Sequence, residues 1–197
     1  MMKKQAVIYE LLQENNGFVT LNQVKESGVS YYTVKKMIGE GKLEKDEPGL
    51  YRLPKVYIDE YYSIQHRYPK GVYSLETALW LHGLSLTIPF EPMMSFPYGT
   101  NTKLIKEYGI KPIILRSNYD EGIVEVMPIK GQAVNVYSVE RTLAECLRSI
   151  YKIDVQIIAP VFKMYARQNK INYSQLFKYA KLFKVERKIQ SYLEVLD

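Results

Sequence analysis

The feature that most constrains the fold is a run of short helical segments, each stopped by asparagine or glycine, at the start of the chain. Apolar side chains of residues 2–14 fall on one helical face, and the Asn-Asn-Gly run at 15–17 ends this segment because both residue types tolerate the left-handed backbone of a helix C-cap. Thr20 and Gln23 then form a capping-box pattern for a second, very short helix, which Gly28 ends. The chain is therefore predicted to begin with a small helical module.

A third helix is predicted over residues 31–40, with Ser30 as its cap. Its helical wheel separates two faces. The face expected to join the core carries Tyr31, Val34, Met37 and Ile38. The face expected to point outward carries Tyr32, Thr33, Lys35 and Lys36. A short turn containing Gly28 separates this helix from the second one, which is the spacing of a helix-turn-helix, whose second helix offers its N-terminal side chains to the DNA major groove.

Residues 42–53 are predicted to form two short strands around a Pro48-Gly49 turn, because proline fixes φ for the turn and glycine supplies the positive φ after it. Helix, short helix, helix and hairpin make a winged helix, which we assign to residues 1–55. Lysines neutralise phosphates, while Tyr and Thr hydroxyls donate to phosphates or reach base edges. The candidate DNA-binding residues are Ser30, Tyr32, Thr33, Lys35, Lys36, Lys42, Lys45 and Arg52.

Two alternatives to DNA binding stay open for this module. Winged helices also serve as protein-docking modules, and lysine-rich exposed faces are usually only solvated. Asp46 and Glu47 lie at the hairpin turn, where carboxylates would repel phosphates. A deep DNA contact by this hairpin is therefore not expected.

Residues 56–197 are predicted to form a larger α+β domain. Its helices are expected at residues 56–68, 74–83 and 138–152, and from 154 to the end with a break near 169–174. Its sheet is expected to be mixed or antiparallel, because short strand-like runs alternate with clusters of Gly, Pro, Asn and Asp. These runs cover residues 86–90, 92–97, 111–117, 122–129 and 132–138. Prolines in several of them favour edge or irregular strands.

The net charge of +6 is concentrated at the two ends of the chain, with +2 in residues 1–55 and +5 in residues 161–197. The last helix, predicted over residues 174–196, is amphipathic, with a basic stripe along about a third of its circumference. The basic stripe comprises Lys178, Lys181, Lys184, Arg187 and Lys188. It is either a solvated face or a second surface for the DNA backbone or an acidic partner.

Cys146 is the only cysteine, so no internal disulfide is expected, and with only His66 and His82 beside it a metal site is hard to assemble. Its place in a helical apolar pattern suits a buried hydrophobe better than a nucleophile. No run approaches the ~20 apolar residues of a membrane span, and the N-terminus turns polar too early for a secretory signal. We expect a cytoplasmic protein that uses no metal and no cofactor.

Enzyme signatures are weak in the second domain. A restriction-type nuclease would need clustered acids followed by Glu-x-Lys on a strand, but Glu125 and Lys130 are five positions apart and fall on opposite strand faces. A nucleotidyltransferase would need a Gly-Ser dipeptide followed by paired acids, and the chain has no Gly-Ser. Glu76 and His82 are six positions apart on a helix and face different directions. An interaction domain is therefore favoured over an enzyme.

Three pieces of sequence give a family resemblance. They are the junction peptide GLYRLP at residues 49–54, VYSLETALWLHGL at 72–84 and VYSVERTLAECL at 136–147. Together with the N-terminal winged helix, they resemble the AbiEi family, the antitoxins and autoregulators of type IV toxin-antitoxin systems linked to abortive phage infection. The resemblance covers nearly the whole chain.

The resemblance implies a bifunctional protein. The winged helix would repress its own operon by binding inverted repeats upstream, and the C-terminal domain would neutralise a nucleotidyltransferase toxin without a stable complex. A monomer in solution that places two copies on the operator is the expected state. One alternative is a winged-helix regulator whose C-terminal domain binds a ligand or a protein partner. Another is an enzyme that modifies a toxin or RNA and depends on Glu76 or Arg141.

Overall fold

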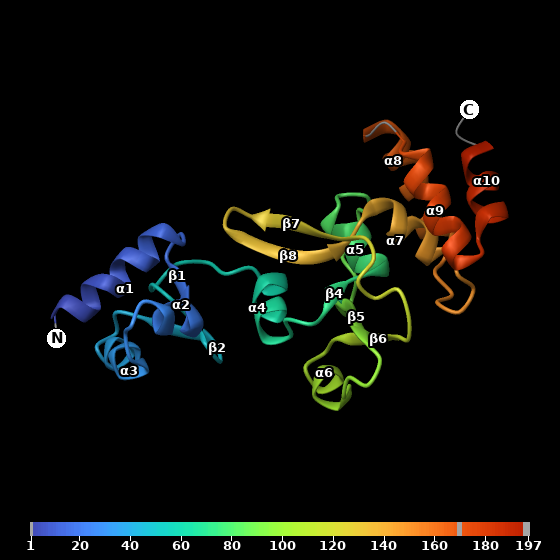
Figure 1. Cartoon of the computed structure of the whole chain (residues 1–197). Helices are drawn as coiled ribbons and strands as arrows, with labels where there is room; N and C mark the ends of the chain where they lie inside the picture. The colour runs from blue at the N-terminus through green and yellow to red at the C-terminus, as the bar shows by residue number, and fades with distance from the viewer. Residues whose placement is uncertain (1, 169–170, 195–197) are drawn as a thin grey trace. The chain divides into compact units, whose positions relative to one another are not determined.

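The computed structural model of this protein describes residues 2–168 and 171–194 (Figure 1). By its internal contacts the chain divides into two compact units, and both contain helices and strands, so the predicted α+β class is confirmed. The first unit comprises Met1–Pro69 with Met127–Val134, and the second comprises Lys70–Val126 with Asn135–Asp197. The domain boundary expected near residue 55 stays a prediction, while contacts group residues 56–69 with the first unit.

The first unit reproduces the predicted succession of helix, short helix, helix and hairpin. Its elements are α1 (Met2–Glu14), β1 (Phe18–Thr20), α2 (Leu21–Glu26), α3 (Tyr31–Gly39), β2 (Glu44–Glu47), β3 (Leu50–Arg52) and α4 (Glu60–Arg67). The predicted capping box of α2 is confirmed, because Thr20 Oγ1 accepts from the Gln23 N–H at 3.2 Å and Gln23 Oε1 accepts from the Thr20 N–H at 2.8 Å. The strands form an antiparallel sheet in the order β1-β3-β2, and Gly49 makes the hairpin turn with a φ of +85°.

The core of the first unit lies where α1, α2 and α3 meet the small sheet. Its fully buried side chains include Ile8, Leu12, Val24, Val34 and Met37. Burying one such side chain contributes about 1.5 to 3 kcal/mol. The cluster therefore fixes which face of α3 is turned toward solvent.

The remaining elements form a mixed sheet and a set of helices. They are β4 (Val72–Tyr73), α5 (Leu75–Leu81), β5 (Met93–Pro97), α6 (Lys103–Glu107), β6 (Lys111–Leu115), β7 (Ile123–Ile129), β8 (Gln132–Tyr137), α7 (Val139–Cys146), α8 (Val155–Gln168), α9 (Tyr173–Phe183) and α10 (Glu186–Glu194). The sheet order is β6-β5-β4-β8-β7, and β4 runs antiparallel to β5 but parallel to β8. Among the described residues, none of the helices has the length and apolar character needed to cross a lipid bilayer.

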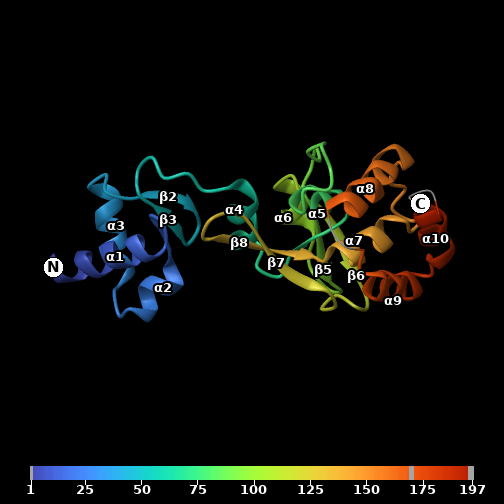
Figure 2. The ribbon, with the colours of Figure 1, turned by 90° about the horizontal axis from the view of Figure 1, so that it is seen from above.

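Helix α7 is central to the core of the second unit, where it packs against α5, α8 and α9 (Figure 2). Ser138 caps it as predicted, because its side chain accepts from the Arg141 N–H at 3.4 Å. Leu143 and Ala144 are fully buried, and so is Arg141. This apolar core therefore encloses a guanidinium.

Three short parts of the second unit differ from the prediction. A strand is predicted over residues 86–90, but this segment is a loop in which Leu86 and Phe90 are exposed. Pro89 lacks the N–H that a sheet ladder needs, which disfavours a strand there. The two-residue strand β4 and the short helix α6 were not predicted, since both are too short to show a periodicity.

The single helix predicted over residues 174–196 is wrong, because α9 ends at Phe183 and α10 begins at Glu186. Lys184 adopts the left-handed conformation with a φ of +58°. The N–H of Val185 then bonds the carbonyl of Ala180 at 2.9 Å, which is the Schellman arrangement. The break buries Val185 in the core of the second unit, and this burial favours it.

Gln132, at the end of the β7–β8 hairpin, makes contacts inside the first unit. Its side-chain oxygen accepts from the Asp59 N–H at 2.6 Å, and its amide donates to the carbonyl of Tyr57 at 3.1 Å. The side chain is buried, so these bonds satisfy its polar atoms away from water. The two partners lie more than seventy positions earlier in the chain, which is why local sequence signals do not reveal this contact.

Candidate nucleic-acid interface

Helix α3 presents a solvent-facing side that only partly matches its predicted face. Tyr32 is 65% exposed and Lys35 is exposed, as predicted. Thr33, predicted to point outward, is only 7% exposed, and Tyr31, predicted to join the core, is 46% exposed. The structure therefore contradicts the predicted orientation of both side chains. The buried stripe of α3 is centred between Val34 and Met37. Around the helix axis, Thr33 lies about 70° from this centre and Tyr31 about 90° from it.

Tyr31 and Ser30 lie at the N-terminal end of α3. The ring centroid of Tyr31 is 6.3 Å from that of buried Tyr51, so Tyr31 covers an edge of the core rather than entering it. Burial is the main reason that the pKa of Tyr51 rises to about 12, and a hydrogen bond with the Tyr31 hydroxyl adds to this rise. Ser30 occupies the cap position as predicted, but its side chain makes no capping hydrogen bond. Its exposed hydroxyl is thus not used to hold the helix.

The C-terminal end of α3 carries a shared ion pair. Lys36 Nζ lies 3.6 Å from one oxygen of Glu40, and Lys42 Nζ lies 2.6 Å from the other. The hydrogen bond from Lys42 lowers the pKa of Glu40, so this carboxylate stays charged. Within the part of the chain that the structure describes, Lys35 and Lys45 have no carboxylate within 4 Å. Within that part of the chain, no ion pair balances the positive charges of these two exposed lysines.

Arg52 is held inside its own module. Its guanidinium lies 2.8 Å from a Glu44 oxygen and 3.5 Å from an Asp46 oxygen, and it donates to the carbonyl of Val56 at 2.9 Å. The side chain is only 26% exposed. This geometry assigns Arg52 to holding the hairpin and the segment after it.

The two acids of the hairpin turn face α4. Asp46 accepts from the Ser63 hydroxyl at 2.6 Å, and Glu47 lies 2.6 Å from the guanidinium of Arg67. Their charges are therefore balanced within the first unit. The repulsion of phosphates expected from these carboxylates is reduced accordingly.

We predict that Arg52→Ala lowers the free energy of unfolding by about 1 to 2 kcal/mol, because it removes two partly exposed ion pairs and one bond to a carbonyl. The salt dependence of DNA binding should stay unchanged, since Glu44, Asp46 and the Val56 carbonyl already engage this guanidinium. Urea denaturation and binding titrations at several salt concentrations measure the two effects. A shallower salt dependence in the variant would return Arg52 to the set of phosphate contacts.

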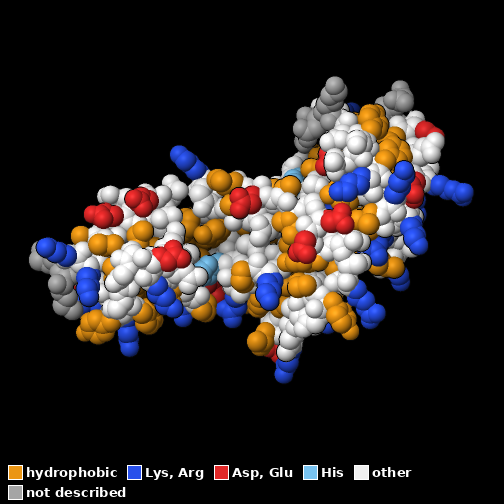
Figure 3. Space-filling view, viewed as in Figure 1, with side chains coloured by type: hydrophobic (Ala, Val, Ile, Leu, Met, Phe, Trp, Pro, Cys, Tyr) orange, Lys and Arg blue, Asp and Glu red, His pale blue; other side chains and the backbone are white. Residues whose placement is uncertain are grey.

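The basic stripe does not form one helical face. Lys178, on α9, lies 3.7 Å from Glu121, and Lys188, on α10, donates to the carbonyl of Leu147 at 2.8 Å. Lys184 sits at the break between the two helices. The predicted continuous stripe is therefore wrong, because it assumed a single helix. Lys and Arg side chains still gather over α9 and α10 (Figure 3). Lys181, Lys184 and Arg187 are exposed.

The residues considered for catalysis occupy structural positions. His82 Nε2 lies 2.7 Å from the carbonyl of Tyr137, to which it donates, and burial lowers the pKa of His82. Cys146 is buried, and burial raises the pKa of its thiol. Over residues 2–168 and 171–194, no group of three His, Cys, Asp or Glu side chains is placed to hold a metal ion.

The fold and the exposed side of α3 define a winged-helix protein that carries a larger α+β part. Residues 7–54 match the family model described as "Transcriptional regulator, AbiEi antitoxin". Over residues 7–54 the resemblance to the AbiEi antitoxin transcriptional regulators inferred from the sequence is confirmed. The match supports a role as a regulator and antitoxin.

The solved structures that match include the RV2827C protein from Mycobacterium tuberculosis. Its TM-score is 0.56 at 10% sequence identity, and the alignment covers 91% of this chain and 71% of that chain. At this identity the likeness shows a shared fold alone. No curated protein matches the chain.

Proposed function

We propose that this protein represses its own operon by placing α3 in the major groove of inverted repeats upstream of its gene. The observation that carries the proposal is the solvent-facing side of α3, with exposed Tyr32 and Lys35, inside a module that matches AbiEi transcriptional regulators. Lysines on this side would neutralise phosphates, and the Tyr32 hydroxyl would reach a phosphate or a base edge. The protein would act in the cytoplasm as a monomer that pairs on DNA.

We also propose that this protein acts as an antitoxin. The C-terminal domain would neutralise a nucleotidyltransferase-like toxin encoded beside it, without a stable complex. The family match supports an antitoxin role. Co-expression with the neighbouring toxin gene tests this half: growth should be restored, and the two proteins should not co-purify. Unrelieved toxicity at matched expression contradicts the neutralising role.

DNA binding is tested with fluorescently labelled duplexes from the region upstream of the gene. Two copies of the protein should bind the full inverted repeat, and one should bind an isolated half-site, because half-site symmetry mirrors the pairing of two modules. A scrambled duplex of equal length should bind roughly 1,000-fold more weakly or worse. Equal affinity for the scrambled duplex would remove the basis for a specific repressor.

We predict that Glu40→Gln strengthens DNA binding. Removing this carboxylate releases Lys36 and Lys42 from their shared ion pair and adds one net positive charge beside α3. At 0.15 M salt the affinity should rise roughly fivefold, and the slope of log affinity against log salt should steepen by about 0.9. Titrations at four salt concentrations measure both values.

The matched control for that variant is Glu10→Gln, which removes an exposed carboxylate from α1. It changes the net charge equally, but Glu10 belongs to α1 and not to the segment that holds the Lys36–Glu40–Lys42 group. An equal gain in both variants would show that only the overall charge matters. No gain in Glu40→Gln would show that this end of α3 does not approach the duplex.

A further inference from the structure

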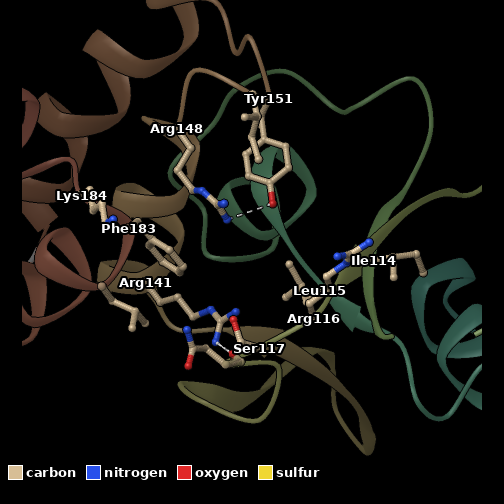
Figure 4. Close-up of a pocket in the computed structure, with 12 residues that line it drawn as sticks. Ile114, Leu115, Arg116, Ser117, Arg141, Arg148, Tyr151, Phe183 and Lys184 are labelled. Carbon is tan, nitrogen blue, oxygen red and sulfur yellow. Dashed lines mark hydrogen bonds between the residues drawn. The ribbon is translucent and has the colours of Figure 1, made fainter. Parts of the chain in front are cut away.

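The second unit contains a cavity of about 500 Å³ that the proposed function does not use (Figure 4). It lies among the end of β6, the first turn of α7, the segment after α7 and the end of α9. Its size falls in the range of sites for small ligands, roughly 300 to 1,000 Å³. The basic groups lining it are Arg116, Arg141, Arg148 and Lys184. Among the described residues that line it there is no carboxylate.

Arg141 is the buried member of this basic group. Its Nη1 donates to the backbone carbonyls of Asn118 and Glu121, and its guanidinium carbon lies 3.5 Å from the centroid of the Tyr137 ring. Its Nε and Nη2 have no hydrogen-bond partner within the described chain, although Nε lies 3.7 Å from a Glu145 oxygen. A fully buried guanidinium with unused donors is costly unless something accepts from it.

Among the residues that the structure describes, Glu145 supplies the only carboxylate within 4 Å of Arg141 and Arg148, the two arginines at the centre of this basic group. Glu145 lies 3.7 Å from Arg141 and 3.7 Å from Arg148, and it is itself buried. Burial raises the pKa of Glu145, and the neighbouring Arg141 and Arg148 guanidinium groups act against this rise, so a single carboxylate stands against two guanidinium groups. Arg116 and Lys184 are exposed at the rim and add two further positive charges. The surroundings of the cavity are therefore strongly positive.

Aromatic and apolar side chains form the other part of the wall. Phe183 and Tyr151 line the cavity, and the Arg148 guanidinium lies 5.2 Å from the Phe183 ring and 5.3 Å from the Tyr151 ring. Arg148 Nη1 also lies within 3.4 Å of the Tyr151 hydroxyl, as the dashed line in Figure 4 shows. Guanidinium groups match phosphate oxygens in a planar fork, and aromatic rings stack on planar ring systems.

We propose that this cavity binds a phosphorylated small molecule, with its phosphate on Arg141, Arg148 and Lys184 and a planar group against Phe183 and Tyr151. A mononucleotide is the chemical class that joins these two parts. The inference goes beyond repression and neutralisation, because it makes the second unit a receptor for a metabolite. A bound phosphate also supplies the acceptor that the Arg141 donors lack.

Calorimetric titration of the full-length protein with adenosine 5′-monophosphate, inorganic phosphate and adenosine tests the proposal. The monophosphate should bind most tightly, inorganic phosphate more weakly, and adenosine at least tenfold more weakly than the monophosphate, since charge-assisted bonds to the phosphate are lost. The absence of measurable monophosphate binding, or equal binding of adenosine, overturns it.

Variants of two cations that line the cavity localise the site. Arg148→Gln keeps donors but removes a charge, and Lys184→Gly removes a charge where the left-handed backbone suits glycine, so folding should be preserved. Each should weaken monophosphate binding about tenfold. The charge-matched control, Arg187→Ala, removes an exposed cation of α10 outside the cavity and should bind normally.

Equal binding by both variants and the control would place the ligand elsewhere and overturn the proposal. A second arm adds an unrelated DNA duplex to the monophosphate complex. Displacement of the monophosphate by this duplex would show that the cavity takes nucleic-acid phosphates, which contradicts binding of a small molecule. Circular dichroism confirms that each variant is folded before titration.

Discussion

Replacing Arg141 with alanine is expected to lower the free energy of unfolding by about 3 to 5 kcal/mol, the range found when one partner of a buried ion pair is removed. The side chain is fully buried, and its loss leaves the carbonyls of Asn118 and Glu121 without their donor. It also leaves Glu145 buried with Arg148 and the Tyr151 hydroxyl as its remaining partners and opens a space beside the Tyr137 ring. Each of these changes lowers the free energy of unfolding.

Urea denaturation followed by near-ultraviolet circular dichroism measures this loss. Arg141→Lys should recover only part of the stability, because a single ammonium cannot replace a planar fork that serves two carbonyls at once. The control Arg187→Ala removes a surface cation and should change stability by less than about 0.5 kcal/mol. A loss below about 1 kcal/mol in Arg141→Ala would mean that water enters the site and satisfies the exposed carbonyls.

The elements of the first unit could be predicted from sequence because their signals are local. The Thr20–Gln23 capping box and Gly49 at the hairpin turn each act within a few positions. The orientation of α3 was less predictable. Thr33 and Tyr31 lie near the edge of its buried stripe, and the packing of Tyr31 against Tyr51, twenty positions later, decides which side each takes.

The second unit depends more on contacts between distant segments. Strand β4 has only two residues and exists because β5 and β8 bond to it on either side. The break between α9 and α10 follows from burial of Val185, and Lys184 has no glycine-like signal that marks a left-handed residue. Burial of Arg141 was equally hidden, since an arginine in an amphipathic helix is ordinarily expected at the surface.

In the candidate interface, too, some features follow from local sequence and others from contacts between separate segments. Residue type and helix spacing sufficed to predict that Tyr32 and Lys35 would be exposed. The ion pairs of Lys36 and Lys42 with Glu40 depend on how the segment after α3 folds back beside it. The ion pair of Arg52 with Glu44 forms only when the hairpin is folded. Sequence could therefore predict which residues are basic, whereas only the structure shows which charges remain unbalanced.

Replacing Lys35 and Lys36 together with alanine is expected to have the largest effect on DNA binding. Two phosphate contacts are lost, so the slope of log affinity against log salt should become shallower by about 1.8, and affinity at 0.15 M salt should fall roughly 30-fold. Stability should change little, because Lys35 is exposed and the Lys36–Glu40 pair lies at the surface, where such pairs contribute little. Anisotropy titrations across four salt concentrations give both values.

The matched control is Lys103→Ala with Lys106→Ala, which removes two exposed lysines from α6 in the second unit. The control lowers the net charge equally, so it separates a local contact from the general attraction of a positive protein to DNA. A steep salt slope retained in the α3 variant but lost in the control would locate the phosphate contacts in the second unit. In that case the exposed lysines of α6 become the surface to test, and α3 is reduced to a structural helix of the module.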